Sequence, residues 1–221
     1  MTAERKRWLD DFIARLDALF GARLEFFGLQ GSYGRGEQTA GSDIDLVIVL
    51  DRVDFADLTA YRKLLDGTED GALVCGFVTG ADELSAWDAA DFVQLYLDTV
   101  PIRGSLDGWA ARLGEADIRR SVLTGACALY HACAHNYLHE RSAGTLAALF
   151  KTARFVVRMK NRAETGTYTP AMRALRERVN ETDGAILDAA AAPDAAGFDA
   201  LSALLFDWAR TVINRFGRPQ N

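Results

Sequence analysis

The order of hydrophobic and polar positions divides the chain into two regions of different texture. Short runs of apolar and β-branched residues occur at 24–29, 43–50 and 72–79, and such runs are typical of buried strands. Residues 54–65 have the apolar spacing of a helix, and another amphipathic helix precedes the first run. The pattern therefore predicts a small sheet with helices in the N-terminal region.

Beyond residue 104 the strand-like runs give way to segments with apolar residues three and four apart. This spacing predicts helices at 117–140, 143–163, 170–179 and 199–216. Turn-forming residues separate these segments, and we interpret the Ala-rich stretch 189–197 as a helix end and a loop. We therefore predict an α+β chain of two domains, with residues 1–104 around the sheet and residues 105–221 as a helical bundle.

A turn bracketed by glycines follows the first predicted strand. Gly31 lets the backbone turn sharply, and Ser32 stands where a helix is expected to begin. The unpaired N–H groups of a helix start can face a phosphate, because they carry partial positive charge. Arg35, one turn later, adds a planar guanidinium. The turn is thus a candidate phosphate-binding loop.

Two aspartates stand at the start of the second predicted strand. Asp43 and Asp45 are separated by one residue, and alternate residues of a strand point to the same face. Two carboxylates crowded on one face repel each other unless a cation lies between them. Mg²⁺ takes oxygen ligands, usually one or two protein carboxylates, and fills its other positions with waters and substrate phosphates. The pair is therefore a predicted magnesium site.

The sequence resembles the polymerase-beta-type nucleotidyltransferase superfamily, which includes minimal and antibiotic nucleotidyltransferases, in Gly31-Ser32-x-x-Arg35-Gly36 followed by Ser42-Asp43-Ile44-Asp45-Leu46. Several constrained positions match at once, which is more specific than a lone glycine-rich loop. The resemblance implies a small mixed, palm-like sheet with helices, followed by a helical bundle. It also implies Mg²⁺-dependent transfer of a nucleoside monophosphate, AMP in our prediction, from a triphosphate to a hydroxyl, with release of pyrophosphate.

The resemblance also implies roles for individual residues. Gly31 and Ser32 would hold the β- and γ-phosphates, and Asp43 and Asp45 would bind the metal. The family usually carries a third carboxylate on the next strand of the same sheet, where it acts as general base. This chain departs from that pattern, because residues 72–79 contain no Asp or Glu.

Three acids outside that strand are candidates for the general base. We favour Asp98, because it lies in an apolar segment where an acid is unusual unless it is paired or functional. Asp82 and Glu83 stay as alternatives, and Asp98 has a competing interpretation as a capping or turn residue before Pro101. If none of these acids acts as a base, the protein binds nucleotide and metal without efficient transfer.

Composition favours a cytoplasmic enzyme. The 221 residues are 49% hydrophobic and 25% charged, contain no apolar run of membrane-spanning length, and begin with an amphipathic helix in place of a signal peptide. Cys75, Cys127 and Cys133 are odd in number and lack the spacing of a metal knuckle. Reduced thiols are their simplest state, and we predict no membrane partner.

The formal net charge of −6 bears on the choice of partners. Proteins that bind long nucleic acid usually present a basic surface, so we do not expect nucleic acid here. The expected partners are a nucleoside triphosphate and a hydroxyl-bearing small molecule or protein. The identity of the acceptor and the choice between monomer and homodimer stay open.

Three histidines recur every four residues in the helical region, at His131, His135 and His139. Paired histidines at this spacing can bind zinc. The outer two are about 12 Å apart along a helix, which prevents one ion from taking all three. We therefore interpret the stripe as a packed or half-exposed helix face.

A second stripe is basic and contains Lys151, Arg154, Arg158 and Arg162. Such a stripe is most often a solvated face. Related families place a basic side chain from the helical domain near the triphosphate, so the resemblance leaves that role open for Lys151.

Two hypotheses from different classes follow. The first is a Mg²⁺-dependent nucleotidyltransferase that modifies a hydroxyl. The second is a catalytically weakened nucleotide-binding module of a regulatory or antitoxin-like kind, which keeps the phosphate loop without turnover.

Overall fold

The computed structural model describes residues 2–39, 41–192 and 197–218. The chain divides into two compact units, one formed by Met1–Asp88 and Leu95–Arg112 and the other by Ala89–Gln94 and Leu113–Asn221. The domain boundary expected at residue 104 stays a prediction. Among the described residues, no helix is both long enough and apolar enough to cross a membrane.

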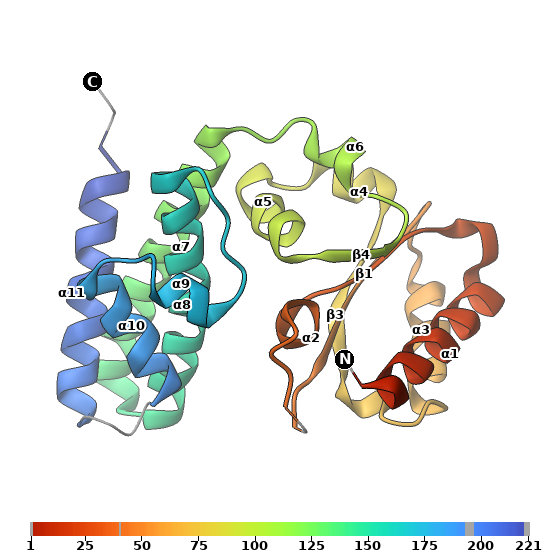
Figure 1. Cartoon of the computed structure of the whole chain (residues 1–221), viewed down its shortest axis with the longest axis horizontal. Helices are drawn as coiled ribbons and strands as arrows, with labels where there is room; N and C mark the ends of the chain where they lie inside the picture. The colour runs from red at the N-terminus through yellow and green to blue at the C-terminus, as the bar shows by residue number, and fades with distance from the viewer. Residues whose placement is uncertain (1, 40, 193–196, 219–221) are drawn as a thin grey trace. The chain divides into compact units, whose positions relative to one another are not determined.

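A mixed sheet, four-stranded in the described part of the chain, forms the centre of the first unit (Figure 1). Its strands are β1 (Leu24–Leu29), β2 (Ile44–Leu50), β3 (Val74–Gly80) and β4 (Val100–Arg103), in the order β3-β2-β1-β4. Strand β1 is antiparallel to β2 and β4, whereas β2 and β3 are parallel. The three predicted strands are confirmed, and β4 is an addition that the sequence pattern did not indicate.

Two helices cover one face of this sheet, α1 (Ala3–Phe20) and α3 (Phe55–Asp66) (Figure 1). Alternate residues of β2 point to them, because side chains of a strand alternate between faces. Ile44, Leu46 and Ile48 are therefore buried in one core with Phe12 and Leu16 of α1. The odd-numbered positions of β2, including Asp45, point to the opposite face.

Several short helices precede, connect or follow the strands along the chain. They are α2 (Gly31–Arg35), α4 (Ala81–Ala86), α5 (Ala89–Asp98), α6 (Asp107–Ala110) and the 3₁₀ turns η1 (Gly21–Arg23) and η2 (Gly71–Leu73). The apolar segment around Asp98, whose local structure the sequence left open, is the end of α5.

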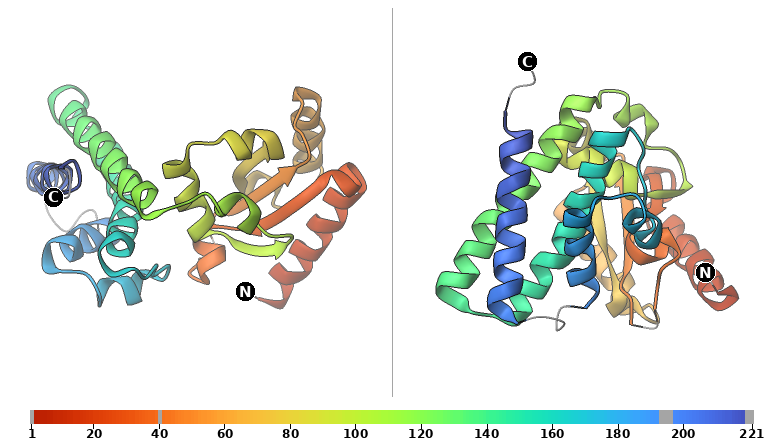
Figure 2. Two further views of the ribbon diagram at one scale, coloured as in Figure 1. Left: turned by 90° about the horizontal axis from the view of Figure 1, so that it is seen from above. Right: turned by 60° about the vertical axis from the view of Figure 1, so that its left-hand side comes forward.

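The second unit is helical (Figure 2). Its helices are α7 (Glu115–His135), which continues into the π-turn η3 (Asn136–Glu140), then α8 (Ala143–Thr165), α9 (Met172–Arg176), α10 (Glu181–Ala191) and α11 (Phe198–Phe216). Helix α7 packs against α8 and α11, and α10 packs against α8. The α+β fold class with a helical C-terminal region is thus confirmed. Helix α10 was not predicted, and residues 193–196 of the expected Ala-rich loop lie outside the described residues.

A buried ion pair joins α8 to α10. Lys160 Nζ lies 2.6 Å from Asp183 Oδ2, and both side chains are almost completely buried. Trp208 Nε1 of α11 donates to the other carboxylate oxygen at 2.8 Å, and Asn180 donates to the first at 3.0 Å. The carboxylate therefore connects three helices through charge-assisted hydrogen bonds.

Candidate active site

The candidate site begins where β1 ends and α2 starts. Gln30 is extended, and Gly31 has a φ of +61°, a left-handed conformation that favours glycine. Gly31 also has no room for a side chain, because an added Cβ would overlap the carboxylate of Asp45. The start of α2 and the Asp45 carboxylate are therefore in direct proximity.

The backbone holds this arrangement in register. The Gln30 N–H donates to the Asp45 carbonyl oxygen at 2.8 Å, which joins the end of β1 to the start of β2. Gln30 Nε2 donates to the Leu95 carbonyl at 3.1 Å and to Thr99 Oγ1 at 2.9 Å. The first N–H groups of α2, at Gly31 and Ser32, have no partner inside the helix, as at every helix start. They are the donors expected to face a phosphate.

The two predicted metal ligands lie beside this turn. Asp45 is the second residue of β2 and is half-buried, whereas Asp43 stands just before the strand and is exposed. Burial raises the pKa of Asp45, the negative charge of Asp43 raises it further, the Arg35 guanidinium lowers it, and the charge of Asp98 raises it. Burial first, and the neighbouring carboxylates second, therefore oppose ionisation of Asp45, and a bound cation would relieve both effects.

The two aspartate carboxylates suit a hard cation that takes only a few of its ligands from the protein. Across the described ranges, no three His, Cys, Asp or Glu side chains are grouped to hold a metal ion. A site with two protein carboxylates fits Mg²⁺, which keeps several waters and substrate phosphates as ligands. It does not fit a closed structural zinc site, which needs four protein ligands.

Arg35 and Asp98 are brought together, although they lie far apart in the sequence. Arg35 donates from Nη1 to Asp98 Oδ2 at 3.0 Å and from Nε to Glu37 Oε2 at 2.9 Å. The Arg35 side chain is 10% exposed and that of Asp98 5% exposed. Arg35 is therefore a fixed positive charge beside Asp45, and its contact with a phosphate stays a prediction. The pairing partner Glu37 was not identified from the sequence.

Glu83 does not join this group. An added Cβ at Gly80 would overlap the Glu83 carboxylate, so Glu83 sits at the end of β3. Gly80 is in register with Leu50 of β2, five residues from Asp45 and about 16 Å along the strand. Asp82 precedes Glu83 on the exposed first turn of α4. Neither acid is placed to act on a hydroxyl at Asp45.

The strand position beside Asp45 is filled by a cysteine. Cys75 of β3 is the in-register neighbour of Asp45, and in-register residues of adjacent strands share a face about 4.8 Å apart. Its thiol is exposed and free. None of the residues of β3 is acidic, as the sequence indicated. The next-strand position at which the family usually carries its carboxylate is thus occupied by an uncharged side chain.

The basic stripe of the second unit lies on α8, and its members differ in their exposure to solvent. Lys151 is exposed on α8, and its approach to a triphosphate stays a prediction. The solvated-face interpretation of the basic stripe is wrong for Arg158, which is 2% exposed and contacts Met172 and the Phe155 ring. Arg162 forms an ion pair with Glu115 at 2.8 Å.

The three histidines form an exposed stripe along α7 and η3. The rings of His135 and His139 lie 5.0 Å apart, and His135 Nε2 lies 3.4 Å from Glu140. They belong to no group of three metal-ligating side chains among the residues with described positions. The interpretation of this stripe as a helix face agrees with the structure, but the face is exposed and not packed.

Comparison with known proteins agrees with the site. Residues 9–81 match the nucleotidyltransferase domain family, so the chain contains a polymerase-beta-type nucleotidyltransferase domain. No curated protein sequence matches the chain. In fold, the chain is similar to the crystal structure of spectinomycin adenyltransferase AAD(9) from Enterococcus faecialis with ATP and spectinomycin, with a TM-score of 0.58 and 14% identity over 99% of this chain and 100% of that one.

Proposed function

We propose that the protein is a Mg²⁺-dependent nucleotidyltransferase that moves AMP from ATP to a hydroxyl of a small molecule and releases pyrophosphate. The observation that carries this proposal is the overlap of any side chain at Gly31 with the Asp45 carboxylate. It puts a helix start suited to phosphate directly beside a carboxylate suited to a metal. A nucleoside triphosphate with its divalent cation needs both a phosphate-binding and a metal-binding group.

Different residues would bind the metal and the phosphates. Asp43 and Asp45 would hold Mg²⁺, which when bound neutralises charge on the triphosphate and polarises its phosphoryl oxygens. Gly31 and Ser32 would donate their N–H groups to the β- and γ-phosphates, which leave together as pyrophosphate. Lys151 is proposed as a further phosphate contact.

The transfer is one substitution at phosphorus. The acceptor hydroxyl oxygen forms a bond to the α-phosphorus of ATP, and the bond from that phosphorus to the bridging oxygen of the β-phosphate breaks. The electron pair leaves with pyrophosphate. Because β3 offers no acid beside Asp45, we propose that the hydroxyl proton passes to water.

For Asp98 we propose a positioning role in place of the general-base role expected from the sequence. The carboxylate is buried, and its Oδ2 already accepts a hydrogen bond from Arg35 Nη1. The pair fixes the Arg35 guanidinium beside Asp45, where its charge favours the ionised, metal-binding form.

A small-molecule acceptor is supported by two observations. The structurally similar spectinomycin adenyltransferase AAD(9) is described with ATP and spectinomycin. The net charge of −6 argues against long nucleic acid. Spectinomycin and the aminoglycosides are therefore the first acceptors to test.

The weakened nucleotide-binding module remains a second candidate function. The absence of an acid from β3, with Cys75 at the place beside Asp45, favours it. The two functions differ in turnover and share nucleotide binding.

Pyrophosphate release separates the two functions. Purified protein is incubated with Mg²⁺ and ATP against spectinomycin, aminoglycosides and lincosamides, and ATP binding is measured in parallel by calorimetry. We expect acceptor-dependent release that falls at least about a hundredfold, or ~2.7 kcal/mol in the barrier, in Asp43→Asn and Asp45→Asn. Asp82→Asn, an exposed acid outside the site, is the matched control and should retain activity. ATP binding without release under every condition would establish the binding module.

A further inference from the structure

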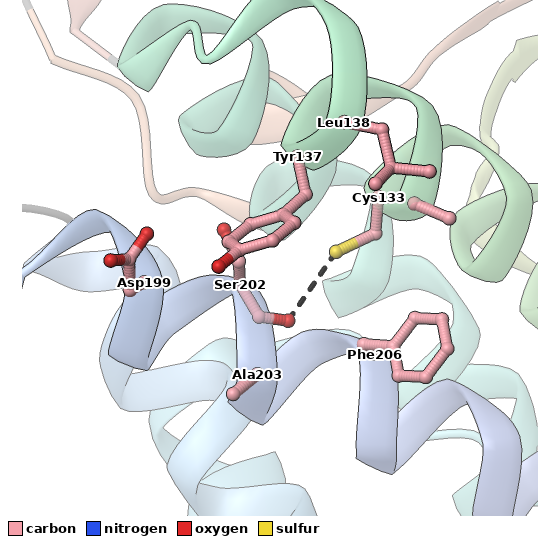
Figure 3. Close-up of a pocket in the computed structure, with 8 residues that line it drawn as sticks. Cys133, Tyr137, Leu138, Asp199, Ser202, Ala203 and Phe206 are labelled. Atoms are coloured by element: carbon pink, nitrogen blue, oxygen red, sulfur yellow. Dashed lines mark hydrogen bonds between the residues drawn. The ribbon is translucent and has the colours of Figure 1, made fainter.

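The second unit contains a cavity that the proposed transfer does not use. It has a volume of about 370 Å³ and lies between the end of α7, η3 and the start of α11 (Figure 3). Its walls are largely apolar and include Tyr137, Leu138 and Phe206. The volume is within the range of small-molecule sites, and apolar walls are their usual lining.

The aromatic walls are held in place by neighbouring side chains. The Tyr137 ring stacks on Phe198 with centroids 6.2 Å apart, and the Arg141 guanidinium lies 4.9 Å from the centroid of each ring. Phe206 packs on Tyr130 with centroids 4.3 Å apart. These contacts join η3 to α11 and α7 to α11, so Tyr137 and Phe206 are held in place without a ligand.

The charge of Asp199 at the rim of the cavity is balanced by an ion pair. Asp199 lines the cavity and pairs with Arg141 at 2.9 Å. At the base, Cys133 Sγ donates to the Ser202 carbonyl at 3.4 Å (Figure 3), and burial raises the pKa of the thiol, which keeps it uncharged. The cavity therefore does not favour a strongly charged ligand.

One polar group at this cavity lacks a partner. Ser202 lines the cavity and is 3% exposed, and its Oγ is buried without a hydrogen-bond partner among the described residues. An unpaired buried hydroxyl costs free energy of folding. A serine hydroxyl reaches other directions by one χ1 rotation, so a ligand in the cavity can supply the missing partner.

We propose that this cavity binds a small, mostly apolar molecule that carries one hydroxyl or similar hydrogen-bonding group, an aromatic alcohol being the simplest chemical class. The rings of Tyr137 and Phe206 contact the apolar body, and Ser202 Oγ bonds the polar group. A protein segment fits less well, because the cavity offers an isolated buried hydroxyl and no row of backbone partners.

The test uses 2-naphthol and naphthalene as probes with the full chain and without nucleotide. Ligand-observed NMR and calorimetry measure binding to wild type, and we expect one site that binds 2-naphthol more tightly than naphthalene. Ala203→Trp changes an exposed cavity-lining position on α11. By filling the cavity it should lower the affinity for both probes at least about tenfold. Ala148→Trp, at an exposed position on α8 outside the cavity, should leave binding within about twofold.

Ser202→Ala tests the polar contact separately. It should lower the affinity for 2-naphthol about three- to tenfold and leave the affinity for naphthalene unchanged. The midpoint of thermal unfolding should stay equal or rise, because an unpaired buried hydroxyl is removed. Absence of probe binding, or binding that Ala203→Trp does not change, would overturn the proposal. A change of sedimentation coefficient in Ala203→Trp but not in Ala148→Trp would also overturn it, because it would identify a protein interface. Neither result depends on nucleotidyl transfer.

Discussion

At the scale of single residues, Asp45 has conflicting demands from folding and from binding. Its pKa is raised in the folded state, so the folded protein binds a proton there more tightly than the unfolded chain does. Stability contributed by this group is therefore greatest at low pH and is lost as the pH rises through the folded-state pKa. Once it is ionised, this carboxylate opposes folding unless a cation is bound.

The first prediction concerns Asp45→Asn. Without metal at neutral pH, the variant should unfold at the same temperature as wild type or a higher one, because a partly buried charge and its repulsion by Asp43 are removed. Mg²⁺ should raise the thermal unfolding midpoint of wild type by about 2–4 °C for each kcal/mol of stabilisation that its binding adds. It should leave the midpoint of the variant unchanged. Calorimetric scans with Mg²⁺ and with EDTA measure both effects. An equal response of the two proteins would contradict metal binding at Asp45.

The second prediction concerns Gly31→Ala. The left-handed φ alone costs about 1–2 kcal/mol for an alanine, and the overlap with the Asp45 carboxylate adds to it. Gly36→Ala is the matched control, because Gly36 has a φ of +73° but open space around an added Cβ. Urea unfolding should show a larger loss for Gly31→Ala, and only this variant should lose Mg²⁺ affinity. Equal losses in the two variants would mean that Asp45 is displaced without cost.

At the scale of secondary-structure elements, the parallel pairing of β2 and β3 decides which side chain faces Asp45. The register is Asp45 to Cys75, and a shift by one residue would move Cys75 to the other face. The sequence showed that this strand has no acid. It did not show which of its residues lies beside Asp45, because register depends on the packing of the whole sheet.

The third prediction follows from that register. Cys75→Asp puts a carboxylate on the same face as Asp45, at an exposed position where its charge is hydrated. A general base contributes about 10²–10⁴-fold, so acceptor-dependent pyrophosphate release should rise by at least about tenfold. Cys75→Ser, which adds no base, is the control. A rate that is unchanged in Cys75→Asp would show that proton removal does not limit transfer.

The fourth prediction concerns the buried pair between α8 and α10. Lys160→Met leaves the Asp183 charge buried without its cation, which should cost about 3–5 kcal/mol. The exposed pair of Lys6 and Asp10 provides the control, because Lys6→Met should cost less than about 1 kcal/mol. Urea unfolding followed by tryptophan fluorescence suits this test, since Trp208 donates to Asp183. Similar losses for the two variants would contradict a structural role for the buried pair.

At the scale of the whole molecule, the charge balance limits the partners. With a formal net charge of −6, the chain lacks the basic excess that neutralises phosphates along a nucleic acid. The fifth prediction is that labelled duplex and single-stranded oligonucleotides show no binding by fluorescence anisotropy at protein concentrations up to ~1 μM in 50 mM salt. Salt-sensitive binding in that range would reopen nucleic acid as the acceptor.

The sequence was most informative where short-range rules apply. Apolar runs, helical spacing and turn chemistry predicted β1, β2, α3 and a helix start at Ser32, one residue after its observed start at Gly31, because these depend on neighbouring residues. It failed for contacts that join distant segments, such as the pair of Arg35 with Asp98, which are 63 residues apart. Helix α10 was missed because Gly184 interrupts a short pattern, although Asn180 caps its start.

The proximity of Gly31 and Asp45 has an evolutionary consequence. While Asp45 is retained for nucleotide chemistry, every other amino acid at position 31 must displace its carboxylate, so the two positions are under a joint constraint. A lineage that abandons transfer loses the need for Asp45, and a smaller residue there frees the space above position 31. Homologues that have lost one of these residues should therefore have lost the other far more often than chance, and their joint loss would mark inactive branches.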